Sequence, residues 1–178
     1  MASNTPQTNA TNNQTALAGQ ANENNSMYRP VSMLDAAEAA KKLQRFIMPS
    51  QLSMLGDLCR GEEMDFFKNK LLELSDTVNS MPVTYETDGQ GDQAVVQLHY
   101  FTQGCDWYVT ERDQETEQLQ AFGMADLGYG GELGYISIVE LLECGAELDL
   151  HWKPKTLAQV SAESQMQDVN YTGHPMHY

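Results

Sequence analysis

Three carboxylates that could do chemistry occur within a short part of this 178-residue chain. Glu111 follows an apolar run, and Asp126 and Glu132 lie on either side of a glycine-rich stretch. Carboxylates that meet in space can bind a hard cation or act as an acid and base pair. Carboxylates at turns more often accept backbone hydrogen bonds or face water. We therefore prefer the role in turns and keep a small metal-binding or hydrolytic site as an alternative.

The histidines and cysteines give weaker signals. His99 and His151 lie in expected strands and could meet across a sheet to bind a metal, but nothing in their spacing requires it. Cys105 is followed by Asp106, whose charge disfavours a reactive thiolate. The three cysteines are widely spaced and odd in number, which indicates reduced thiols. We predict no catalytic residue, no metal and no cofactor.

Aromatic side chains gather in the same part of the chain as the three carboxylates. Trp107 and Tyr108 are adjacent in an expected strand, so their side chains should face opposite sides of the sheet. Aromatic residues that face outward could form a partner-binding patch with an acidic rim. The candidate binding residues are Trp107, Glu111, Asp126, Tyr129, Glu132 and Tyr135.

Acidic residues outnumber basic ones by 25 to 10, which gives a net charge of −15. Residues 28–92 carry eleven acids and seven bases, whereas residues 93–160 carry eleven acids and three bases. The second segment is therefore the acidic half, while Lys41, Lys42 and Arg45 form a small basic spot in the first. An acidic surface repels phosphates, so direct nucleic-acid binding is not expected. Such a surface can attract cationic partners or imitate the charge of a nucleic acid.

The chain length suits one domain with a tail at each end. Residues 1–27 are rich in Asn, Gln, Thr, Ala and Ser, and we predict that they are disordered. Residues 161–178 are predicted to form a loose second tail. The domain between them, residues 28–160, divides into a helical part (32–80) and a β-rich part (82–160).

No run approaches the roughly 18 consecutive apolar residues that a membrane span needs. The N-terminus also lacks the basic start and apolar stretch of a secretion signal. We therefore expect a cytoplasmic protein with no membrane partner.

Helical periodicity marks the first part of the domain. Ser32 followed by Asp35 predicts the start of a helix, and Pro49 is expected to end that helix. A short second helix or turn is expected over residues 50–59. Residues 62–81 show the clearest apolar stripe, with apolar side chains at three- and four-residue steps.

β-branched and aromatic residues dominate the second part. Residues 94–101, 106–111 and 119–127 are predicted to form an antiparallel meander of three strands. Residues 146–152 alternate apolar and polar side chains, as a half-buried strand does, and residues 83–86 could form one more short strand.

The remaining segments connect these strands. Four glycines between Gly128 and Gly134 predict a tight connection from strand to helix. Ser137 and Glu140 are spaced to begin a short helix, and a last helical turn should start near Thr156. Together the elements predict an α+β fold, with N-terminal helices packed on a small, mainly antiparallel sheet of four to five strands.

Three blocks in the acidic half form a pattern. Their residues are Trp107, Thr110 and Glu111; Phe122, Gly123, Asp126, Leu127 and Gly128; and Glu132, Leu133, Gly134, Tyr135, Ser137, Glu140 and Leu141. These blocks are similar to a family of small proteins carried by plasmids, phages and other mobile elements, the domain of unknown function 2958, and the resemblance spans about Tyr100 to Leu150. It implies a mobile-element origin and a cytoplasmic protein, and it implies no activity.

These observations favour a non-enzymatic phage or plasmid accessory protein. It would bind a host or element protein through the acidic β-rich face, and its sharpest form is an inhibitor of a nucleic-acid-binding defence enzyme. One alternative is the small metal-binding or hydrolytic domain built on Glu111, Asp126 and Glu132. Another is a virion or structural protein. The sequence predicts neither the partner nor the oligomeric state.

Overall fold

The computed structural model describes Met1 and residues 30–171, with the backbone alone for residues 165–171. Apart from Met1, the predicted N-terminal tail lies outside the described residues. Every helix and strand below belongs to the unit Val31–Tyr178. In the part of the chain that is described, no helix combines the length and apolar character needed to cross a bilayer.

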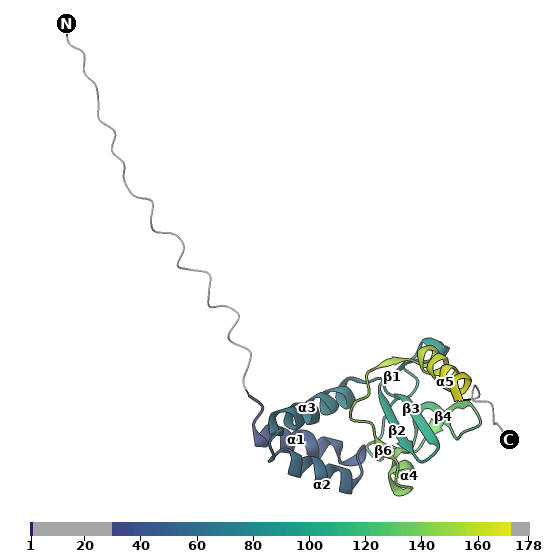
Figure 1. The fold of residues 1–178 in the computed structure, drawn as a ribbon, viewed down its shortest axis with the longest axis horizontal. Helices are drawn as coiled ribbons and strands as arrows, with labels where there is room; N and C mark the ends of the chain where they lie inside the picture. Colours follow the sequence, from purple (N-terminus) through teal and green to yellow (C-terminus); the bar gives the residue numbers. More distant parts are fainter. Residues whose placement is uncertain (2–29, 172–178) are drawn as a thin grey trace, which may run out of the picture. The chain divides into compact units, whose positions relative to one another are not determined.

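Three helices form a layer beside the sheet (Figure 1). They are α1 (Met33–Lys42), α2 (Pro49–Leu58) and α3 (Met64–Ser80), with the 3-10 turn η1 (Leu43–Arg45) between the first two. Ser32 and Asp35 form a capping box at the start of α1, as the sequence predicts. The first helix ends before Pro49, and Pro49 is itself the first residue of α2. Proline fits this position because the first helical turn leaves its N–H groups unpaired.

The main sheet has five antiparallel strands in the order β5-β4-β3-β2-β6. They are β2 (Leu98–Thr102), β3 (Cys105–Glu111), β4 (Ala121–Asp126), β5 (Gly131–Ile136) and β6 (Glu147–Leu148). The predicted α+β class and the meander, here β2 to β4, are confirmed. The glycine-rich segment departs from its prediction, because it supplies a strand, β5, that pairs with β4 from Gly131 to Ile136.

Shorter elements complete the fold. They are η2 (Gly91–Gln93), β1 (Val95–Val96), α4 (Ile138–Glu143), β7 (Lys155–Thr156) and α5 (Leu157–Tyr171). Strands β1 and β7 pair with each other as a second small sheet. The Ser137 side chain accepts a hydrogen bond from the N–H of Glu140 at the start of α4, as expected. Val83 forms only an isolated bridge, to Arg112, in place of the short strand considered for that segment.

Helix α5 continues into the segment for which the sequence predicts a loose tail. Thr156 and Gln159 explain its start, because each side chain accepts a hydrogen bond from the other residue's backbone N–H. Leu157 and Val160 anchor the first turns in a buried cluster. The helix therefore begins where expected and runs to Tyr171, and residues 172–178 lie outside the described part of the chain.

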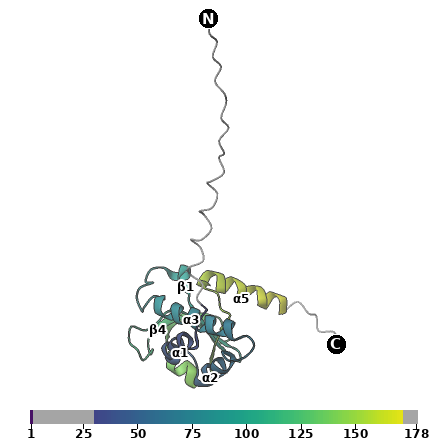
Figure 2. The ribbon, with the colours of Figure 1, turned by 90° about the vertical axis from the view of Figure 1, so that its left-hand side faces the viewer.

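The sheet separates two apolar clusters. On one side, α1 to α4 pack on the sheet around buried residues such as Tyr100, whose hydroxyl donates a hydrogen bond to the carbonyl of Phe46 at 2.9 Å. On the other side, Met124 packs against β1 and α5. Figure 1 shows α5 on the far side of the sheet from the helical layer, and Figure 2 looks onto that layer with α5 extending beyond it.

Trp107 and Tyr108 confirm the predicted alternation of side chains along the strand. Trp107 packs against the cluster beneath the helices, and Tyr108 packs against the cluster beneath α5. Neither ring lies free on the surface, since both are half-buried.

A buried side chain of α2 forms hydrogen bonds to the edge strand β6. Nε2 of Gln51 in α2 donates to the carbonyl of Leu148 in β6 at 2.8 Å. Oε1 of the same amide accepts from the N–H of Leu148 at 3.1 Å. Gln51 therefore satisfies both backbone groups of a residue in the outermost strand.

Candidate functional site

Glu111 is a buried anchor and takes no part in the exposed surface. Its side chain is only 2% exposed. Oε2 accepts a hydrogen bond from the N–H of Tyr85 at 2.8 Å. Oε1 accepts from the N–H of Thr87 at 2.5 Å and from its hydroxyl at 2.6 Å. The carboxylate thus holds residues 83–90 against the end of β3.

A β-bulge directs Glu111 to this position. Val109 pairs with Gly123, but the next pair is Glu111 with Phe122, so Thr110 is the extra residue. Residues in direct register share a face of the sheet, so the bulge moves Glu111 to the face that carries Phe122. A Cβ on Gly123 would lie 2.1 Å from the carbonyl oxygen of Tyr108, so the strands approach this closely only because residue 123 is glycine.

The backbone of Tyr85 has a φ of +81°, a conformation that residues other than glycine rarely adopt. The residue is 66% exposed. The Tyr135 hydroxyl donates to the Tyr85 hydroxyl at 2.9 Å, and this hydrogen bond raises the pKa of Tyr135. The ring of Tyr135 also contacts Phe122, with the ring centres 5.7 Å apart. We call Tyr85, Phe122 and Tyr135 the aromatic patch.

The other candidate residues of the β4–β5 hairpin do not join this patch. Asp126 accepts hydrogen bonds from the N–H groups of Gly128 and Gly130, at 2.9 and 3.3 Å, and so shapes the turn. Tyr129 at the tip of the turn is 99% exposed. Glu132 is exposed and pairs with Ala125, which puts it on the opposite face from Asp126.

The three carboxylates that the sequence singles out are therefore not brought together. Glu111 pairs with Phe122, four residues from Asp126 along β4, which corresponds to roughly 13 Å at the usual rise of a strand. Among the described residues, no group of three or more His, Cys, Asp and Glu side chains is arranged to hold a metal ion. The preferred role in turns agrees with the contacts of Glu111 and Asp126.

A polar cleft of about 920 Å³ lies on the side of the sheet covered by α5. Nδ1 of His99 lies 3.2 Å from Asp149, and its Nε2 lies 2.8 Å from Asp106. The imidazole also stacks on the ring of Tyr108 at 4.8 Å. Both carboxylate contacts are hydrogen bonds only when the ring carries both protons. Asp106 and Asp149 thus fix the position of His99. The exposed His151, which the sequence suggested could meet His99, is not among these partners.

The charges around this cleft affect Tyr108 as well. Burial, together with the charges of Asp106 and Asp126, raises the pKa of Tyr108 to about 12, so the hydroxyl stays protonated at neutral pH. The ammonium of Lys155 lies 4.6 Å from the centre of the Trp152 ring and forms an ion pair with Glu163. The charged and aromatic side chains of this cleft described above mainly contact one another.

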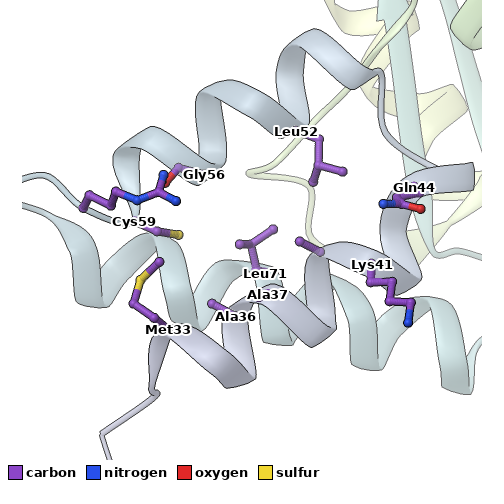
Figure 3. Close-up of a pocket in the computed structure, with 11 residues that line it drawn as sticks. Met33, Ala36, Ala37, Lys41, Gln44, Leu52, Gly56, Cys59 and Leu71 are labelled. Carbon is purple, nitrogen blue, oxygen red and sulfur yellow. The ribbon is translucent and has the colours of Figure 1, made fainter.

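A second hollow, of about 410 Å³, lies between α1 and α2 with Leu71 of α3 as part of its floor (Figure 3). Its walls are mostly apolar and carry several small side chains. Figure 3 shows Lys41 and Gln44 toward one end and Met33 and Cys59 toward the other. We call this hollow the helical groove. The sequence does not predict this groove, because alanine and glycine in a helical pattern indicate closely packed helices and give no sign of a space between them.

Comparisons with known proteins give one finding. The model of the family described as "Protein of unknown function (DUF2958)" matches residues 69–162, which is more than half of the chain. The matched segment runs from α3 into α5, so it contains the five-stranded sheet, the aromatic patch and Glu111. No curated protein and no solved structure matches the chain.

Proposed function

The chain belongs to the DUF2958 family, whose function is unknown, and we propose a function from the surface that its sheet presents. The protein binds a protein partner through its acidic β-rich half, with the aromatic patch at the centre of the contact. The observation that carries this proposal is the conformation of Tyr85. A buried carboxylate holds an exposed tyrosine at a φ of +81°.

Backbone strain of this kind costs about 1 kcal/mol or more and persists only where surrounding contacts enforce it. Here the hydrogen bonds to Glu111 supply that enforcement. Strained residues gather at functional sites, and tyrosine is enriched among the residues that dominate binding energy at interfaces. A ring that is already fixed loses little conformational entropy when a partner arrives.

The charge around the patch favours a basic partner. Glu86 and Asp88 are exposed in the same loop as Tyr85. Residues 93–160, which supply most of the sheet, carry eleven acids against three bases. Such a surface steers a positively charged partner toward the patch and weakens as salt rises.

The most specific form of the proposal is a cytoplasmic accessory protein of a phage or plasmid that inhibits a nucleic-acid-binding defence enzyme. The acidic surface would occupy a basic groove that otherwise holds nucleic acid, and the aromatic patch would add contacts that phosphates cannot make. A metal-binding or hydrolytic role gains no support from the positions of Glu111, Asp126 and Glu132.

The test compares two tyrosines of one hairpin. Wild-type protein, Tyr135→Ala and Tyr129→Ala are used as affinity baits in host lysate, and the captured proteins are quantified by mass spectrometry. Tyr129 is the matched control, because it is equally aromatic and more exposed but lies outside the patch. We expect Tyr135→Ala to reduce capture of the partner by about tenfold and Tyr129→Ala to leave capture unchanged.

The captured partner is then purified and its complex is measured as NaCl rises from about 50 to about 500 mM, with and without duplex DNA. Weakening by salt and displacement by DNA support the inhibitor. A complex whose affinity changes neither with salt nor with DNA, or whose affinity is the same for Tyr135→Ala as for wild type, contradicts the proposal.

A further inference from the structure

The helical groove lies on the other side of the sheet from the aromatic patch. Helices α1 to α3 pack on the face that carries Tyr100, whereas Phe122 and Tyr135 belong to the face covered in part by α5. Except for Leu71, the residues that line the groove precede the segment that the family model matches. The groove is therefore separate from the proposed function in both position and sequence.

Gly56 keeps the groove open. It lies inside α2, where glycine is about 1 kcal/mol less favourable than alanine. A Cβ added to residue 56 would meet nothing closer than Nη1 of Arg60, at 4.0 Å, and its φ is not in the left-handed region. The fold would therefore accept a side chain here. What glycine provides at this position is open space beside Ala36 and Ala37 on the facing helix.

The groove differs from the rest of the molecule in charge. Residues 31–60 carry four bases and three acids, in a chain whose net charge is −15. Lys41 and Arg60 line the groove, and both side chains are exposed. Nη1 of Arg60 donates to the carbonyl of Gly56 at 2.8 Å, which places the guanidinium beside Gly56. The same nitrogen lies 3.6 Å from Oδ1 of Asp57, an exposed ion pair that offsets part of its charge. Apolar walls with positive charge at the rim match a ligand that is apolar on one face and acidic beside it.

We propose that the helical groove binds an amphipathic helical segment of a partner protein, with apolar side chains in the groove and carboxylates at Lys41 and Arg60. Two helices that form walls above a third make a shape that receives a helix, and small wall residues allow the incoming backbone to approach closely. Residues 1–29 of the chain do not fit this description, because Glu23 is their one acidic residue.

The probe is a fluorescein-labelled synthetic peptide of about 14 residues, which corresponds to about four helical turns. Leucines at i, i+3, i+4 and i+7 form its apolar face, and glutamates lie beside them. A matched peptide carries lysine in place of each glutamate. Fluorescence anisotropy with the full chain measures binding of each peptide. We expect the acidic peptide to bind and the basic peptide to bind at least about tenfold more weakly.

Two substitutions locate the site. Gly56→Leu fills the groove and should weaken binding of the acidic peptide by about tenfold or more, while thermal unfolding confirms that the variant is folded. Lys41→Glu should weaken binding by about two- to fivefold more than Lys42→Glu, which makes the same charge change at an exposed residue outside the groove.

Three results would overturn the proposal. They are no binding of the acidic peptide, equal binding to wild type and Gly56→Leu, and equal effects of Lys41→Glu and Lys42→Glu. Sedimentation without peptide provides a further test. Self-association that Gly56→Leu abolishes would assign the groove to a second copy of the chain instead of a partner protein. None of these measurements involves Tyr85 or Tyr135, so failure here leaves the proposed function untouched.

Discussion

At the aromatic patch, a buried carboxylate, a β-bulge and a hydrogen bond between two tyrosines fix one exposed ring in a strained conformation. At the helical groove, no such device is present among the described residues that line it, and the surface exists because Gly56 and several alanines supply little volume. The first surface is held in place by contacts that lie beneath it. The second depends only on the side chains that form its walls.

This difference predicts how each surface responds to substitution. Changes in the interior should damage the aromatic patch together with the stability of the fold. Changes at the groove should alter binding while the fold stays intact or becomes more stable. Four substitutions test this contrast, from the largest expected change in the free energy of unfolding to the smallest.

Gly123→Ala should be the most destabilising. Its Cβ would lie 2.1 Å from the carbonyl oxygen of Tyr108 and 2.9 Å from Cα of Val109, so backbone must move at the bulge. We expect a loss of about 3–5 kcal/mol, measured by urea unfolding. Gly134→Ala is the control, because Gly134 pairs directly with Gly123 and a Cβ there meets nothing within 4 Å. Similar losses for both variants would show that the bulge does not demand glycine.

Glu111→Gln should be next. The substituted amide puts an NH₂ group where a carboxylate oxygen now accepts hydrogen bonds from Tyr85 or Thr87. We expect a loss of about 2–3 kcal/mol in urea unfolding, together with faster hydrogen exchange at these two backbone N–H groups. Unchanged exchange would mean that the loop is held by other contacts, and the aromatic patch would lose its structural explanation.

Asp113→Asn tests a second buried carboxylate of the same half. Burial raises the pKa of Asp113, but backbone hydrogen bonds from Glu115, Gln120 and Leu119 outweigh burial and hold the pKa below its ordinary value. A lowered pKa in the folded state stabilises the fold above the unfolded-state value of about 3.9 and loses this effect as pH falls through the lowered pKa.

We therefore expect Asp113→Asn to lose about 1–2 kcal/mol in urea unfolding at neutral pH. The difference from wild type should stay constant between about pH 5 and pH 7 and shrink below about pH 4. A difference that grows on acidification would contradict the sign of the pKa shift.

Gly56→Ala should have the smallest effect and the opposite sign. Alanine is the better helix former and meets no close contact at residue 56. We expect a gain of about 0.5–1 kcal/mol, seen as a higher midpoint of thermal unfolding. A loss of stability would mean that the glycine serves packing within the helices, and the groove would then need no functional explanation.

Much of this architecture follows from local sequence signals. Helix α3 shows apolar side chains at helical spacing, and the starts of α1 and α4 carry capping residues, so each appears where predicted. Strand β5 could not be predicted in this way. Its glycines at 131 and 134 offer no apolar side chain to reveal a strand, and the segment becomes one by pairing with β4.

The candidate site was harder to predict than the fold. Glu111 stood out in the sequence, but its role depends on a one-residue bulge and on Tyr85 and Thr87, which precede it by more than 20 positions. No local pattern indicates that Tyr85 adopts a positive φ. His99 likewise contacts Asp149, 50 residues away in the sequence. Asp149 directly follows the edge strand β6, which becomes a neighbour of β2 only in the folded sheet.

The contact between Gln51 and Leu148 has a consequence for the behaviour of the molecule at high concentration. A primary amide that offers one donor and one acceptor imitates the peptide group of an additional strand. With that place already filled from within the chain, an extended segment of another molecule cannot continue the ladder at Leu148. The helical layer thus protects the protein from fibrous aggregation at this boundary, a role that neither of its candidate binding surfaces would reveal.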